Sequence, residues 1–125
     1  AIAIYDYIQW VLNKGDFMPH YMITGSYNAD GAKALIAEGG SHRLEQAKGL
    51  IESLGGTLEA MYFAYGADDI VGICEMPDAA SAAAASLAVS SSGTVNVQMT
   101  PLLTADELDA ASGIVQNAQY RAPGQ

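Results

Sequence analysis

Two glutamates within apolar stretches are the residues of this chain best suited to acid–base chemistry. Glu59 lies in residues 57–65, TLEAMYFAY, and Glu75 lies in residues 69–76, DIVGICEM. Both stretches predict strands, because alternation, aromatic residues and β-branched residues are typical of half-buried sheets. If the strands share a sheet, either glutamate could act as the acid or base of a small-molecule pocket.

The two histidines and the single cysteine predict no metal and no cofactor. A catalytic zinc site usually has three protein ligands, and His20 and His42 supply only two. A third would have to be Asp68, Asp69 or a glutamate, and no spacing in the sequence indicates such a set. We interpret His42, beside Ser41 at a predicted helix start, as a solvated surface group. Cys74 has no disulfide partner within the chain and is expected to be a buried, unreactive thiol.

Length and charge exclude several classes of function. A chain of 125 residues that is 50% hydrophobic can form one domain with a core. Its formal net charge of −9 argues against nucleic-acid binding, which needs Lys and Arg to neutralise phosphates, and against anionic lipid surfaces. No apolar run approaches the roughly 20 residues of a membrane span. With one cysteine and no evident signal peptide, the chain is expected in the cytoplasm.

Seven segments position these residues in the predicted order β-α-β-β-α-β, in which the first crossover holds two helices. Gly66-Ala67-Asp68-Asp69 joins the two central strands as an antiparallel hairpin, and Pro101 is expected to end the last strand. This order predicts an α+β, ferredoxin-like four-stranded antiparallel sheet with the helices on one face. The predicted strands are 20–27, 57–65, 69–76 and 94–100, the predicted helices are 29–38, 41–54 and 78–90, and a further short helix at 105–112 opens with a capping box.

Alternation along the strands assigns side chains to the sheet face that carries no helices. We expect this face to be a sheet-to-sheet interface centred on apolar residues, because several exposed apolar side chains on an open sheet would be costly. An alternative is a partly polar pocket between the paired sheets. The predicted interface residues are Met61, Phe63, Val71 and Ile73, and the candidate pocket residues are Thr24, Glu59, Phe63, Glu75, Asn96 and Gln98.

The first 17 residues differ from the rest of the chain. Their apolar residues recur at helical spacing and extend nearly all round the predicted helix, which is typical of a helix buried on more than one side. We predict either a helix packed on its own domain or a docking helix for a partner groove. The residues assigned to it are Ile4, Tyr5, Ile8, Trp10, Val11 and Leu12.

Several motifs in residues 18–125 resemble the GYD-domain family. They are MPHYMITGSY at 18–27, EGGS at 38–41, ESLGG at 52–56, LEAMYFAYG at 58–66, TPLLT at 100–104 and YRAPGQ at 120–125. The resemblance implies a fold of the dimeric α+β barrel type and carries almost no mechanism. The signature of the family falls on residues 66–69, where Asp68 replaces the usual tyrosine. Residues 1–17 lie outside the resemblance, so we predict an N-terminal helical extension followed by a GYD-like domain at 18–125.

Two functions follow as predictions. The favoured one is a non-enzymatic oligomeric module, at least a dimer of itself, which uses residues 1–17 for docking into a larger assembly. The alternative is a small-molecule-binding protein or cofactor-free enzyme with a pocket between paired sheets. This alternative is based only on analogy with other proteins of the same fold. A closed pocket that holds Glu59 or Glu75 would favour the second.

Overall fold

The structure, a computed structural model, describes residue 4 and residues 18–125. It divides into two compact units, one of which is Met18–Leu102, while the other includes Leu103–Gln125. Of the predicted docking helix only Ile4 is described, with helical backbone and 66% of its surface exposed. The other five residues assigned to that helix, Tyr5, Ile8, Trp10, Val11 and Leu12, lie outside the described residues.

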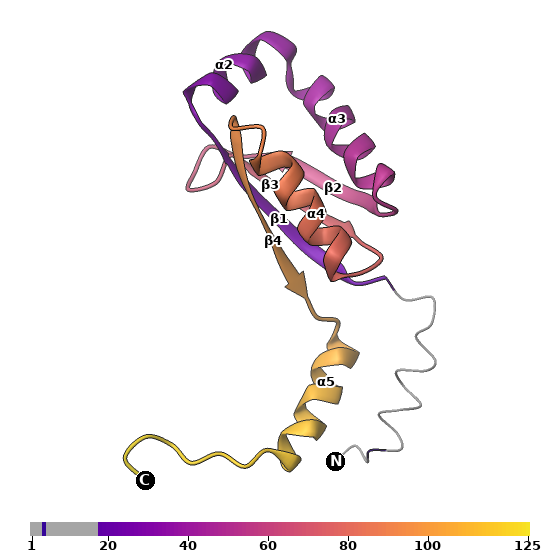
Figure 1. Ribbon diagram of the computed structural model, residues 1–125, viewed down its shortest axis with the longest axis vertical. Coiled ribbons are helices and arrows are strands. Elements are labelled where there is room, and N and C mark those ends of the chain that lie inside the picture. The colour runs from indigo at the N-terminus through magenta and orange to yellow at the C-terminus, as the bar shows by residue number, and fades with distance from the viewer. Residues whose placement is uncertain (1–3, 5–17) are drawn as a thin grey trace. The chain divides into compact units, whose positions relative to one another are not determined.

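The first unit is built on a four-stranded antiparallel sheet in the order β2-β3-β1-β4 (Figure 1). This order, with the two crossover connections through helices, is the ferredoxin-like arrangement that the sequence predicts. The strands are β1 His20–Tyr27, β2 Thr57–Phe63, β3 Ile70–Glu75 and β4 Val95–Leu102.

Three helices belong to this unit, and each begins or ends at a residue suited to it. Asn28 accepts a hydrogen bond from the Gly31 N–H at the start of α2, and Asp78 accepts one from the Ser81 N–H at the start of α4. Gly39, with φ of 89°, separates α2 from α3, a backbone angle that favours glycine. The helices are α2 Ala29–Glu38, α3 Gly40–Ser53 and α4 Ala79–Ser90.

Helices α3 and α4 cover one face of the sheet, and the core lies between them and the strands. Cys74 and Met76 are fully buried, and Ala82 and Ala85 of α4 are 3% and 2% exposed. Small alanine side chains let α4 approach the sheet closely. The core cluster consists of Tyr21, Ile23, Ile51, Cys74, Met76, Ala82 and Ala85.

Strand β4 continues past the proline that was expected to end it. Pro101 pairs with Tyr21, and the strand ends at Leu102. The prediction was wrong because β4 is the edge strand of this sheet. An edge strand tolerates proline, since an amide that faces away from the neighbouring strand is not needed for the ladder.

The second unit contains α5 Ala105–Ile114, followed by a 3-10 turn, Val115–Asn117. The Thr104 hydroxyl accepts a hydrogen bond from the Glu107 N–H, and the Glu107 carboxylate accepts one from the Thr104 N–H. This reciprocal pair is the capping box that the sequence predicts. The helix runs two residues beyond the predicted end at Ser112.

Candidate functional site

The helix-free face of the sheet, called the open face from here on, carries side chains from all four strands. Its middle rows are set by the strand register, in which Ala60, Ile73, Met22 and Thr100 lie across the sheet in one row, and Tyr62, Val71, Thr24 and Gln98 lie in the next. Of these, Tyr62 is 72% exposed, Val71 37% and Ile73 38%. The face therefore has an apolar strip over β2 and β3 and a polar border along β4.

A β-bulge in β2 changes which of its residues belong to the open face. Leu58 pairs with Cys74, whereas Ala60 pairs with Ile73, so Glu59 is the extra residue on its strand. Since side chains alternate between faces, one inserted residue moves every later side chain to the opposite face. Beyond Glu59, the open face therefore receives Ala60 and Tyr62.

Met61 and Phe63 consequently lie on the face that the helices cover, and their predicted place on the open face was wrong. Met61 pairs with Gly72 and lines a groove together with residues of α3 and α4. A Cβ atom on Gly40, the first residue of α3, would lie only 3.2 Å from the Phe63 ring. Phe63 is therefore removed from the candidate pocket, and both residues are removed from the centre of the predicted interface.

One end of the open face gathers an imidazole and two carboxylates. The Nε2 atom of His20 lies 2.8 Å from Glu59 Oε1 and 3.2 Å from Glu75 Oε1. Each residue can offer one nitrogen or oxygen atom such that the three atoms lie within 4.8 Å of one another. The three side chains are about one-third exposed, at 29%, 38% and 33%, so solvent reaches them.

Three neighbouring strands and the bulge assemble this cluster. His20 of β1 lies directly opposite Glu75 of β3, and Thr57 of β2 lies on the other side of Glu75. In a regular strand Glu59 would lie on the open face with Thr57, but Met61 would then lie on the open face as well. The bulge allows Glu59 to reach His20 while Met61 turns to the core, which is a common use of bulges beside functional sites.

The cluster brings Glu59 and Glu75 near each other and adds His20, a residue that the sequence did not place among the candidate pocket residues. The sequence predicts no metal site at His20, because the two histidines supply only two ligands and no spacing indicates a third. The available signal was alternation along β1, which places His20 on the same face as Met22 and Thr24, and therefore on the face assigned to Glu75. The cluster can bind a cation, hold a proton between nitrogen and oxygen, or form an ion pair.

The remaining candidate pocket residues share the open face but lie farther along it. Thr24 pairs with Gln98, and Asn96 pairs with Ser26. Thr24 lies four residues along β1 from His20, a separation of about 13 Å at about 3.3 Å per residue. A ligand that contacted both the cluster and these amides would have to span that distance.

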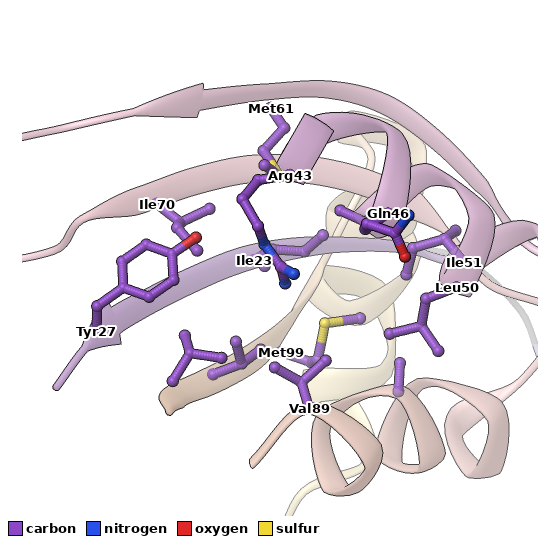
Figure 2. Close-up of a pocket in the computed structure, with 14 residues that line it drawn as sticks. Ile23, Tyr27, Arg43, Gln46, Leu50, Ile51, Met61, Ile70, Val89 and Met99 are labelled. Atoms are coloured by element: carbon purple, nitrogen blue, oxygen red, sulfur yellow. The ribbon is translucent and has the colours of Figure 1, made fainter. Parts of the chain in front are cut away.

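The groove that Met61 lines lies on the other face of the sheet, between α3, α4 and the strands (Figure 2). The sequence did not predict it. Its lining is mostly apolar, with Tyr27, Arg43 and Gln46 as the polar side chains. Its volume of about 90 Å³ is well below the roughly 300–1,000 Å³ of ligand pockets. We therefore treat it as a shallow gap in the packing.

The other reactive residues have structural surroundings. Burial raises the pKa of the Cys74 thiol to about 11, with a smaller contribution from the negative charge of Glu59. His42 is exposed near the start of α3. Asp69 anchors the loop between β2 and β3, because its carboxylate accepts a hydrogen bond of 2.8 Å from the Tyr27 N–H and its carbonyl accepts one from Ala64.

In the part of the chain that the structure describes, no helix has the length and apolar character needed to cross a membrane. Neither the curated proteins nor the solved structures gave a match to the chain. Comparison with protein families matches residues 21–112 to the GYD domain. This match includes residues 21–27 of β1, the other three strands, helices α2 to α4, the bulge, Glu59 and Glu75, and it covers most of the chain. His20 lies one residue before the match. The chain therefore belongs to the GYD domain family.

Proposed function

We propose that the protein is a homo-oligomeric module whose open face packs against the open face of a second copy. The observation that carries this proposal is the apolar strip of Tyr62, Val71 and Ile73, each at least 37% exposed on a sheet face that α3 and α4 do not cover. Burying an aliphatic or aromatic side chain contributes roughly 1.5–3 kcal/mol. A stacked second sheet would remove this strip from water.

The border of the open face suits such an interface. Gln98, Asn96 and Thr100 are exposed polar residues along β4, and the His20–Glu59–Glu75 cluster lies at one end. Interfaces commonly combine an apolar centre with a polar, hydrated border. The resemblance to dimeric α+β barrels, noted from the sequence, points the same way.

A concentration series tests the pairing. Sedimentation velocity of the wild-type protein should give a mass of at least two chains at micromolar concentration. Ile73→Asp should lower that mass, because it places an uncompensated charge in a desolvated interface. Ile36→Asp is the matched control, since Ile36 is 83% exposed on α2, away from the open face.

The proposal fails if the wild-type chain is monomeric throughout the series. It also fails if Ile73→Asp and Ile36→Asp leave the mass equally unchanged while circular dichroism shows that both variants are folded. Dissociation by Ile36→Asp alone would place the interface on the helical side instead.

The second candidate function is small-molecule binding between the paired sheets. The specific observation in its favour is the cluster of two carboxylates and an imidazole beside an apolar strip, a combination common in ligand sites. Native mass spectrometry would reveal a retained ligand as added mass on the oligomer.

Two further expectations belong to this proposal. Residues 1–14 are expected to form a helix that packs against protein, and rapid hydrogen exchange throughout them in the assembled protein would contradict this. A cytoplasmic location is supported by the single cysteine, which needs no oxidising compartment.

A further inference from the structure

We propose that His20, Glu59 and Glu75 form a binding site for a divalent transition-metal ion, with Zn²⁺ as the reference ion. The donor set of one imidazole nitrogen and two carboxylate oxygens is one that zinc accepts. This inference rests on the geometry of one chain, so it stands or falls separately from the pairing of open faces.

The separations between the donor atoms fit one shared ion. Zinc–nitrogen and zinc–oxygen bonds of about 2.0–2.2 Å in a tetrahedron place neighbouring donors about 3.3 Å apart. His20 Nε2 lies 2.8 Å from Glu59 Oε1 and 3.2 Å from Glu75 Oε1. One donor atom from each residue lies within 4.8 Å of the others, so small side-chain rotations would bring all three to one ion.

Charge also favours a cation at this place. Two carboxylates held near each other repel, and the chain as a whole carries a formal charge of −9. A divalent ion would neutralise both carboxylates with the imidazole uncharged. Mg²⁺ and Ca²⁺ fit less well, because calcium takes six to eight oxygen ligands and magnesium keeps most of its water.

The site is held by rigid parts of the fold. His20 and Glu75 are directly paired residues of adjacent strands, and Glu59 is the extra residue of the β2 bulge. Three protein ligands leave a fourth position for water or a further ligand, as in catalytic zinc sites. The ion would therefore be accessible from the open face.

Isothermal titration of the full, chelator-treated chain with ZnCl₂ tests the site. We expect one Zn²⁺ per chain in the wild-type protein and little heat from MgCl₂. His20→Gln and Glu59→Gln should each weaken Zn²⁺ binding by at least about tenfold, because each removes one of three ligands. His42→Gln is the matched control and should bind Zn²⁺ as the wild-type protein does, since His42 lies outside the cluster.

Cobalt gives a second readout that depends on the site itself. Co²⁺ added to the wild-type chain should give visible absorption bands that Zn²⁺ abolishes and that Glu75→Gln lacks. Circular dichroism checks the fold of each variant, and if one variant does not fold, the other two ligand variants decide. Zinc binding that survives all the ligand variants, or that His42→Gln weakens equally, would overturn the proposal.

A wild-type chain that binds no zinc would also overturn the proposal, and the cluster would then be an ion pair of His20 with two carboxylates. Mass measured on the same samples separates the two proposals. A monomer that binds zinc would refute the pairing of open faces and leave the metal site standing.

Discussion

The thiol of Cys74 should react far more slowly in the native protein than in the unfolded chain. Cys74 is 0% exposed in the middle of the core cluster. Burial, with a smaller contribution from Glu59, raises its pKa from 9.0 to about 11. Because only the thiolate attacks a disulfide reagent, both its ionisation and its access to the reagent are reduced.

The ionisation effect alone has a definite size. At pH 8 the raised pKa lowers the thiolate population by about 100-fold, since each pKa unit is a factor of ten. Burial then requires the sheet to open before the reagent can reach the sulfur. We therefore expect a native rate at least about 100-fold below the rate in denaturant.

The same shift makes stability depend on pH in a known direction. The folded state holds the thiol proton more tightly than the unfolded chain does. The burial of the protonated Cys74 thiol therefore stabilises the fold fully below about pH 9, and this stabilisation is lost as the pH rises through about 11. At about 1.4 kcal/mol per pKa unit, the free energy of unfolding should fall by about 3 kcal/mol across that range.

Two measurements check the reasoning. Reaction with a coloured aromatic disulfide at pH 8 gives the rates in buffer and in concentrated guanidinium. Urea unfolding between pH 8 and pH 11 gives the stability curve, and Cys74→Ala is the control that removes the contribution of the thiol to the pH dependence. A native rate within tenfold of the unfolded rate would refute the burial of Cys74 and the strand pairing behind it.

Two further predictions concern the loop and the glycines, and urea unfolding measures both. Asp69→Ala should lower the free energy of unfolding by about 1–3 kcal/mol, because the Tyr27 N–H loses a carboxylate partner at 2.8 Å; an unchanged midpoint would show that the loop is held by other contacts. Gly56→Ala should destabilise, because a Cβ there would lie 2.4 Å from the Glu75 carbonyl oxygen. Gly49→Ala, in helix α3 with no atom within 4 Å of a Cβ, should instead stabilise by roughly 0.5–1 kcal/mol; effects of the same sign would contradict the packing.

Local patterns in the sequence were sufficient for most of the elements. Strand β1 and helix α2 have the predicted bounds, and Asn28, Asp78 and Thr104 cap the helices that follow them. These signals are local, because a cap bonds to a residue three positions away and alternation needs only neighbouring residues. The order of the elements then implied the sheet topology.

Local patterns could not predict on which face of the sheet each β2 side chain lies. Alternation from Leu58 placed Met61 and Phe63 on the open face, and the bulge at Glu59 reversed them. A bulge depends on how two strands pair with each other and pack against the helices. The residue pattern of one strand therefore does not reveal it. The open face therefore received Tyr62 in place of Phe63.

The sequence by itself determined an acidic α+β chain of the GYD family with capped helices and four strands. It also indicated Glu59 and Glu75 as candidate acid–base residues. Only the tertiary structure decided that His20 joins them. His20 and Glu59 are 39 positions apart, and their atoms meet because β1 pairs with β3, β3 pairs with β2, and one inserted residue turns Glu59 toward the imidazole. Distances between side chains on different strands depend on register, and register is a property of the packed sheet.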